Sequence, residues 1–324
     1  MSFIQPRIPP LPTSLDLSGK VALVTGANRT LGYATSQHLI RHGLAKLIMG
    51  VRSLKAGEAA RQTLLDDAKE RGQSPLPEIL VRVIDMISPK SVVSFVEGLQ
   101  AEGITLNIAI LNAGISELSF AVSEETQFER IFQVNYVSTA LLSVLLLPLL
   151  SSNDSSKPNQ LCVVGSEAYN MSSYNTKLKT PESIFNEFND PSHFRITRYS
   201  DTKYFLYLFL RRLASHRPVK EHNVQIVCTC PGMVGTDIGR NAHWVLRWIF
   251  AVILWMRARS QEDGAAVIAS AGTGLAGDKA HGEMFRNMIV EECVVFLLTP
   301  FSALVTDQAL PDLLLAQLPK RVSR

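Results

Sequence analysis

The chain has 324 residues, of which 46% are hydrophobic and 19% are charged, and its formal net charge is +3. This balance is typical of a globular protein with a large core, in one large domain or at most two small ones. Because the net charge is small and the basic residues form no long run, we expect no nucleic-acid partner.

The N-terminal residues 1–18 are rich in proline and show little periodicity, so we expect an irregular arm followed by one catalytic domain over 19–324. This start has no apolar stretch long enough for a signal peptide. The chain has four cysteines and no C-x-x-C pair: Cys162, Cys228, Cys230 and Cys293. Buried free thiols in a reducing compartment explain this usage, and we therefore expect a cytoplasmic protein.

From residue 20 onward, short apolar β-rich runs alternate with helical patterns. We expect strands within 20–27, 44–52, 78–86, 106–114, 160–168 and 224–232. Helices are expected over 31–42, 53–72, 88–102, 123–150 and 199–216, and polar surface loops over 151–160 and 172–198. This alternation predicts an α/β fold in which helices cover both faces of a doubly wound parallel sheet. Such a sheet binds its ligand at the carboxyl ends of its strands.

The first predicted strand runs directly into a glycine-containing turn, Thr25–Gly32, and a helix follows. Glycine lets the backbone turn tightly and approach a pyrophosphate, while the free amides of a helix N-terminus bind its negative charge. We expect a dinucleotide site here, and a plain strand-to-helix turn is the alternative. The expected contacts come from Gly26, Asn28, Arg29, Thr30, Leu31 and Gly32.

The second predicted strand ends at Arg52, where a cofactor with a free ribose 2′-hydroxyl usually meets Asp or Glu. A guanidinium offers charge and a planar donor fork that suit a 2′-phosphate, and Arg29 lies in the glycine turn. We therefore expect NADP(H) as the cofactor. The alternative is that Arg52 is a solvated residue at the end of a strand.

The pentapeptide Tyr199–Lys203 opens a helical run in which residues four apart share one face. A phenol has a pKa near ~10 and is a poor acid–base group at neutral pH unless a nearby ammonium or an oxidised nicotinamide lowers that pKa. Tyr199 beside Lys203 can then exchange a proton with an alcohol or carbonyl oxygen. By itself, the pentapeptide is equally typical of a surface helix.

Taken in order, these motifs resemble the short-chain dehydrogenase/reductase family, in its retinol-dehydrogenase-like or specialised-metabolism branch. The family pattern T-G-x-x-x-G-x-G matches residues 25–32, with Thr30 in place of the middle glycine. The family's N-A-G, Y-x-x-x-K and P-G-x-V-x-T follow at 112–114, 199–203 and 231–236. The resemblance covers about residues 18–240 and implies a single Rossmann-like domain.

The resemblance also implies roles for single residues. Ser166, at the end of the fifth strand, would hydrogen-bond the substrate oxygen, and Asn135 would order a water that links Lys203 to solvent. Lys203 would also bind the nicotinamide ribose, beside Tyr199. Further cofactor contacts would come from Asp85, Asn112, Ala113, Gly114, Pro231, Gly232, Val234 and Thr236.

Two regions bear on the substrate. The enlarged loop 167–198 is expected to form one wall of the cleft, where Tyr169 and Tyr174 either line it or are ordinary loop aromatics. The apolar stretch 243–256 holds all three tryptophans, within a substrate lid expected around 237–260. It is shorter than the about 20 residues of a membrane span.

The stretch 243–256 has two further interpretations, a helix in a membrane interface and a subunit contact. The last apolar block, 288–318, is expected to pack as a helix and an extended cover. A homodimer or homotetramer is compatible with the family resemblance. No metal is expected, because His243 and His281 have no ligand-spaced partner.

The resulting prediction is an NADP(H)-dependent oxidoreductase that acts on CH–OH groups. It would reduce a ketone or aldehyde on a lipophilic small molecule, or oxidise the alcohol, in specialised metabolism. The alternatives are a non-catalytic NADP(H)-binding regulator and a family member repurposed as a cyclase or isomerase.

Overall fold

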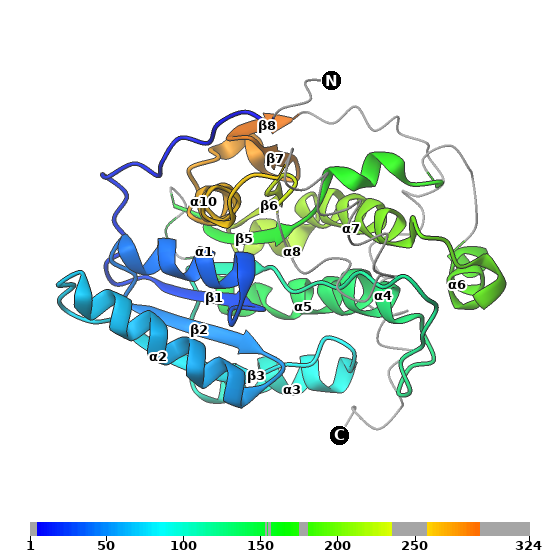
Figure 1. The fold of residues 1–324 in the computed structure, drawn as a ribbon, viewed down its shortest axis with the longest axis horizontal. Helices are drawn as coiled ribbons and strands as arrows, with labels where there is room; N and C mark the ends of the chain where they lie inside the picture. Colours follow the sequence, from blue (N-terminus) through cyan, green and yellow to red (C-terminus); the bar gives the residue numbers. More distant parts are fainter. Residues whose placement is uncertain (1–4, 153, 155–156, 175–180, 235–257, 292–324) are drawn as a thin grey trace.

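The computed structural model describes residues 5–152, 154, 157–174, 181–234 and 258–291, and these residues build one eight-stranded sheet (Figure 1). Its strands are β1 Val21–Thr25, β2 Lys46–Val51, β3 Glu78–Val83, β4 Ile108–Leu111, β5 Asn159–Val164, β6 Val224–Cys230, β7 Met284–Arg286 and β8 Ile289–Glu291. Their order across the sheet is β3-β2-β1-β4-β5-β6-β7-β8. The six strands expected from the sequence are therefore confirmed.

The direction of winding reverses at β1, which pairs in parallel with β2 on one side and with β4 on the other. In a doubly wound sheet the crevice at this reversal is where a ligand binds. The ladder stays parallel through β7, and β8 closes the far edge antiparallel to β7. The predicted fold class, a Rossmann-like doubly wound parallel sheet, is confirmed, with one antiparallel strand added at its edge.

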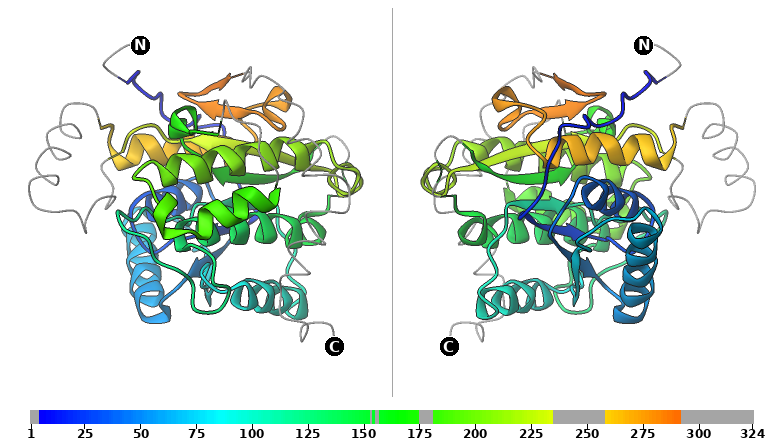
Figure 2. Two further views of the ribbon diagram at one scale, coloured as in Figure 1. Left: turned by 90° about the vertical axis from the view of Figure 1, so that its right-hand side faces the viewer. Right: turned by 90° about the vertical axis from the view of Figure 1, so that its left-hand side faces the viewer.

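Helices cover both faces of the sheet, as Figures 1 and 2 show. One face carries α1 Thr30–Arg41, α2 Leu54–Glu70 and α10 Gln261–Gly272. The other carries α3 Pro89–Ala101, α5 Thr139–Leu145 and α7 Arg198–Ala214. Shorter helices are α4 Arg130–Phe132, α6 Pro181–Asn189 and α8 Arg217–Glu221, and the π or 3₁₀ turns are η1 Gln133–Ser138, η2 Leu147–Leu150, η3 Glu167–Met171, η4 Pro191–His193 and η5 Asp278–Ala280.

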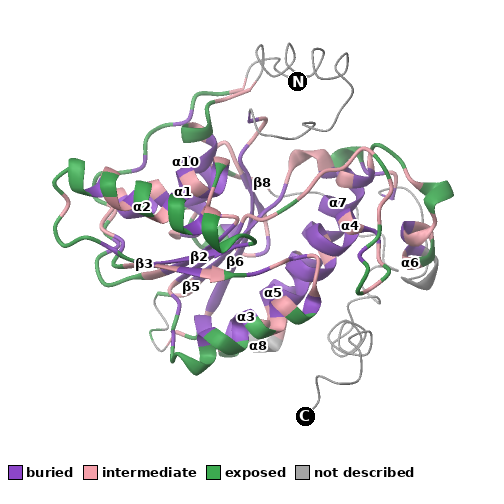
Figure 3. Ribbon diagram, turned by 60° about the horizontal axis from the view of Figure 1, so that its bottom comes forward, coloured by how far each residue is buried: buried purple, intermediate pink, exposed green. Residues whose placement is uncertain are grey.

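The core consists of two apolar clusters, one on each face of the sheet. Along β1, Leu23 packs into the cluster under α3, α5 and α7, while Val24 packs into the cluster under α1 and α10. Because both faces are covered, the inner strands β1, β2, β4, β5 and β6 are buried along almost their whole length, as Figure 3 shows. This is the physical reason for their continuously apolar sequences.

Two expected elements differ from the structure. The helix expected over 123–150 begins only at Arg130, because Val122 and Glu129 form an antiparallel bridge that closes the preceding segment as a turn. It then widens into the π turn η1 before continuing as α5. The surface loop expected over 172–198 contains α6 and η4, and its Phe188 is fully buried.

The C-terminal part also differs from expectation. Residues 289–291, expected in a helix or cover, form the edge strand β8, and α10 was not anticipated. The stretch 243–256, most of the proposed lid, Thr236, Cys293 and the rest of 288–318 lie outside the described residues. Cys162, Cys228 and Cys230 are buried thiols. Among the helices of the described ranges, none is long and apolar enough to cross a bilayer.

Candidate active site

The glycine turn after β1 has the shape that its two glycines require. Gly26 has φ +67°, a left-handed conformation that suits glycine. A Cβ on Gly32 would lie 2.4 Å from the carbonyl oxygen of Gly26 and 2.6 Å from Nδ2 of Asn112. Gly32 therefore allows the close contact between α1 and the turn that a dinucleotide site needs.

The middle position of the turn is held by Thr30, whose φ is +46°. A β-branched residue is rarely found in this left-handed region, where a non-glycine residue costs about 1–2 kcal/mol. The backbone thus keeps the conformation natural to the glycine of the family pattern. The N-cap residue of α1, Arg29, makes no side-chain capping hydrogen bond.

The N-A-G segment is tied to the end of β1 across the winding reversal. The amides of Asn112 and Ala113 both donate to Oγ1 of Thr25, at 3.0 and 3.1 Å, and Nδ2 of Asn112 donates to the carbonyl oxygen of Thr25 at 3.0 Å. The next residue is Gly114, where a Cβ would lie 3.2 Å from Oδ1 of Asn135. N-A-G therefore joins the glycine turn to the region expected to be catalytic.

Asn135 lies in the π turn η1, a feature that is frequent at functional sites. Its Nδ2 donates to the carbonyl oxygen of Ile115 at 2.8 Å, and its Oδ1 accepts from the amide of Ile115 at 2.8 Å. Nδ2 also lies 3.3 Å from Oγ1 of Thr202. Asn135 therefore links the segment after N-A-G to the first turn of α7, next to Lys203.

Ser166, Tyr199 and Lys203 meet at the carboxyl end of β5. The side chain of Ser166 hydrogen-bonds that of Tyr199. Nζ of Lys203 donates to the carbonyl oxygen of Val164 at 2.7 Å and lies 5.6 Å from the centre of the Tyr199 ring. Ser166 also caps η3, where its Oγ accepts from the amide of Ala168 at 3.2 Å. The structure thus brings together side chains that are far apart in sequence.

Burial dominates the electrostatics of this cluster. It raises the pKa of Tyr199 to about 12, against the lowering effect of the hydrogen bond from Ser166. It also lowers the pKa of Lys203 to about 8. The expected lowering of the pKa of Tyr199 is therefore corrected for the protein alone, where loss of hydration outweighs the hydrogen bond with Ser166. At neutral pH the phenol keeps its proton.

The P-G-x-V segment follows β6 and is hydrogen-bonded by the side chains of Gln5, in the N-terminal arm, and of Arg259. The side-chain amide of Gln5 donates to the carbonyl oxygen of Met233 at 2.8 Å and accepts from its amide at 2.9 Å. Arg259 donates to the carbonyl oxygen of Pro231 at 3.0 Å. Sequence reasoning missed Gln5 and Arg259, because no local motif connects them to this turn.

The remaining expected cofactor contacts lie at the same carboxyl edge of the sheet. Arg52 is exposed directly after β2. Asp85 is half-buried after β3, and its Oδ1 accepts from the amide of Ile87 at 3.0 Å. Residues at the carboxyl ends of β1 to β6 therefore lie along one edge of the sheet, the edge at which a doubly wound fold binds a dinucleotide.

The two tyrosines of the enlarged loop are core residues. Tyr169 and Tyr174 are both buried, and Tyr174 stacks on Phe188 with ring centres 5.7 Å apart. They therefore fit the interpretation as ordinary structural aromatics and do not line an open wall.

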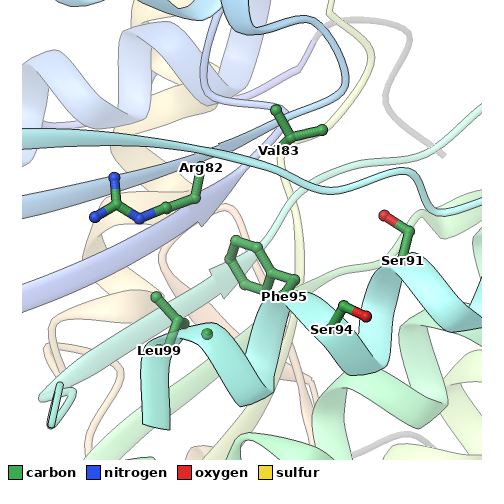
Figure 4. A pocket seen from close by; sticks show the side chains of 7 residues that line it. Arg82, Val83, Ser91, Ser94, Phe95 and Leu99 are labelled. Atoms are coloured by element: carbon green, nitrogen blue, oxygen red, sulfur yellow. The ribbon is translucent and has the colours of Figure 1, made fainter. Parts of the chain in front are cut away.

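A pocket in the described part of the chain lies away from these residues, between β3 and α3 (Figure 4). Its volume of about 200 Å³ is below the roughly 300 Å³ at which ligand pockets usually begin. It is lined by Arg82, Val83, Ser91, Ser94, Phe95, Gly98 and Leu99. Since none of these side chains is among the expected site residues, we assign it no role in the site.

Comparison with known proteins gives consistent matches. The family described as short chain dehydrogenase matches residues 20–177. A short chain dehydrogenase of Arthrobotrys oligospora is 33% identical over 297 residues, which cover 91% of this chain and 90% of that protein. The short chain dehydrogenase yanD of Aspergillus niger is 35% identical over 305 residues, covering 93% and 91%.

Solved structures match at the level of the fold. The Pseudomonas aeruginosa RhlG/NADP active-site complex superposes with a TM-score of 0.59 at 23% identity, covering 85% of this chain and 97% of that chain. An NADPH-bound short chain oxidoreductase of Pseudomonas aeruginosa PAO1, described as containing an atypical catalytic center, gives a TM-score of 0.60 at 18% identity, covering 84% and 96%.

Proposed function

The chain belongs to the short-chain dehydrogenase/reductase family, and within this family of oxidoreductases we propose that it uses NADP(H) to reduce a ketone or aldehyde on a lipophilic small molecule. The observation that carries the proposal is the meeting of Ser166, Tyr199 and Lys203 at the end of β5, beside the glycine turn and N-A-G. Tyr199 as proton donor, the hydroxyl of Ser166 and the ammonium of Lys203 would then surround the substrate carbonyl.

The residues at the strand ends fit a phosphorylated dinucleotide. Gly32 leaves room for close approach to the turn, and α1 begins without a side-chain cap, so its first amides can face a pyrophosphate. Arg52, exposed after β2, would bind a 2′-phosphate with its charged fork, together with Arg29. When bound, the reduced nicotinamide supplies a hydride to the substrate carbon.

The chain's own residues would manage the substrate oxygen and its proton. Tyr199, protonated because burial raises its pKa to about 12, would donate the proton to the oxygen as charge develops on it. Ser166 would turn its hydroxyl from Tyr199 to the substrate oxygen and stabilise the developing charge. Lys203, with a pKa of about 8, is charged at neutral pH and would hold the ribose hydroxyls.

A lipophilic substrate is supported by two exposed apolar side chains beside the catalytic residues. Met171 ends η3, the turn that begins after Ser166, and Ile196 lies three residues before Tyr199. Each has 66% of its surface exposed, so each would offer an apolar contact to a substrate bound next to Ser166 and Tyr199. Specialised metabolism, a homo-oligomeric state and peripheral membrane contact through 243–256 remain proposals.

The first test measures cofactor binding. The protein is titrated with NADPH and, separately, with NADH, and binding is monitored by fluorescence. We expect wild type to bind NADPH more tightly than NADH, and Arg52→Ala to weaken NADPH alone by roughly 10- to 100-fold, the value of one charge-assisted contact. Equal affinities in both proteins would contradict the assignment of Arg52. Absence of binding by wild type would contradict the proposed function.

Turnover distinguishes an enzyme from an NADP(H)-binding regulator. Tyr199→Phe is expected to retain NADPH affinity and to lose about 10²- to 10⁴-fold in the rate of carbonyl reduction. The regulator is favoured if wild type binds NADPH but reduces no member of a panel of lipophilic ketones and aldehydes.

A further inference from the structure

An ion pair is buried directly beside the proposed proton donor. Nε of Arg198 lies 3.3 Å from Oε2 of Glu129, and the two side chains are only 2% and 1% exposed. The guanidinium also donates to the carbonyl oxygen of His193 at 2.8 Å and lies 4.1 Å above the centre of the Phe188 ring. Arg198 is the first residue of α7, and Tyr199 is the second.

The start of α7 is held by side chains from its own first turn and not by a cap. Its N-cap residue, Thr197, makes no side-chain capping hydrogen bond. Arg198 instead reaches Glu129, and Asp201 accepts from Oγ of Ser172 at 2.8 Å. Tyr199 lies between these two anchored residues, so the place of its hydroxyl depends on them.

The other partner, Glu129, fixes the start of the helical segment that carries Asn135. Its carbonyl oxygen accepts from the amide of Gln133 at 2.8 Å, within the first turn that follows. Its own amide donates at 3.1 Å to Oδ1 of Asn189, the last residue of α6. The ion pair therefore joins the helix that carries Tyr199 and Lys203 to the helix that carries Asn135.

A contribution to folding stability does not by itself explain the buried pair of Arg198 and Glu129. Neither carboxylate oxygen of Glu129 has a hydrogen-bond partner among the described residues, and the aromatic rings of Phe132 and Phe188 pack together nearby. Burial raises the pKa of Glu129 to about 7, a sign that its charge is poorly solvated. Replacing a buried pair by apolar residues of similar volume is often neutral or stabilising, so stabilisation alone does not account for this pair.

We propose that Arg198 and Glu129 are positioning residues, which fix the first turn of α7 against the helix of Asn135 so that Tyr199 and Lys203 stay opposite Ser166. This inference rests on the proposed function for its kinetic readout. Neither side chain contacts the substrate or the cofactor in the proposed mechanism. They act through the backbone of α7, where a displacement of about 1 Å can cost roughly 100-fold in rate.

The deciding experiment replaces the whole pair by apolar side chains of similar size, Glu129→Leu with Arg198→Met. We expect the double variant to fold with a melting temperature equal to or above that of wild type. Its kcat for carbonyl reduction should fall ~10- to 100-fold while KM and the NADPH Kd change little. A kcat within about twofold of wild type would overturn the proposal, because a merely structural pair leaves kcat unchanged.

Two further variants exclude general effects. Arg198→Lys keeps the charge but loses the planar fork, and its kcat should fall between those of wild type and the double variant. The matched control is the exposed pair of Arg82 and Glu102, which lie 2.8 Å apart at the β3 edge of the sheet, with three strands between β3 and β5. Arg82→Gln with Glu102→Gln should retain the wild-type kcat.

An activity-independent readout keeps the proposal testable if wild type reduces no substrate and the proposed function fails. Amide hydrogen exchange over residues 198–203 should be faster in the double variant than in wild type, since the first turn of α7 has lost its anchor. The residues 89–101 of α3 serve as the internal reference and should exchange equally in both proteins. Unchanged exchange at 198–203 would overturn the inference.

Discussion

Gln5 and Met233 are 228 residues apart, yet the side-chain amide of Gln5 pairs with both backbone polar groups of Met233, as a neighbouring strand would. The arm that carries Gln5 runs across the molecule toward β8 in Figure 1, and its Ile8 and Leu11 are buried. The irregular N-terminal arm is therefore part of the structure that holds the turn after β6.

Removing this contact should weaken cofactor binding. In Gln5→Ala the turn 231–234 loses two hydrogen bonds of about 0.5–1.5 kcal/mol each, and the NADPH Kd should rise several-fold. Gln5→Glu keeps the acceptor and loses the donor, so its Kd should lie between the two. NADPH titration of the three proteins measures this, and equal Kd values would show that the turn keeps its shape without the arm.

The glycine turn should tolerate no side chain at Gly32. In Gly32→Ala the new Cβ would lie 2.4 Å from the carbonyl oxygen of Gly26, so α1 must shift away from the turn and NADPH binding should be lost. Gly98 in α3 is the matched control, since a Cβ there meets nothing within 4 Å. Gly98→Ala should bind NADPH normally, and its free energy of unfolding should rise by up to ~1 kcal/mol. Normal NADPH affinity in Gly32→Ala would contradict the role given to this turn.

The pH dependence of carbonyl reduction should be set by Lys203. Burial lowers its pKa to about 8, so the ammonium is present below that pH and is lost as the pH rises through it. Tyr199, with a pKa of about 12, keeps its proton over the same range and does not limit the reaction. We expect kcat/KM to fall above about pH 8, measured in steady-state assays with NADPH. A flat profile up to pH 10 would contradict this assignment.

The same shift should appear in the stability of the protein. The native state binds fewer protons at Lys203 than the unfolded state between about pH 8 and its ordinary value of 10.5, so the free energy of unfolding gains from this group as the pH rises through that window. Lys203→Met removes the gain. Urea unfolding of both proteins at pH 7 and pH 9.5 therefore provides the control, and an identical pH dependence would show that Lys203 is not perturbed.

The sequence by itself determined six of the strands and the order of the motifs along them. Strands buried on both faces need continuous apolar runs, and the turns that follow them need glycine at Gly26 and Gly32, so these features are visible within a few residues of one another. The helical spacing of Tyr199 and Lys203 is equally local. Each of these signals lies inside one strand–turn–helix unit.

Only the tertiary structure decided the contacts that join such units. The three-residue strands β7 and β8 are too short for a periodic signal, and α6 lies in a segment whose proline and polar residues are typical of loops. The pairing of Arg198 with Glu129 and of Gln5 with Met233 depends on which distant side chains become buried together. A charge or an amide carries no sequence pattern for its partner, because the partner is chosen by burial and distance after the chain has folded.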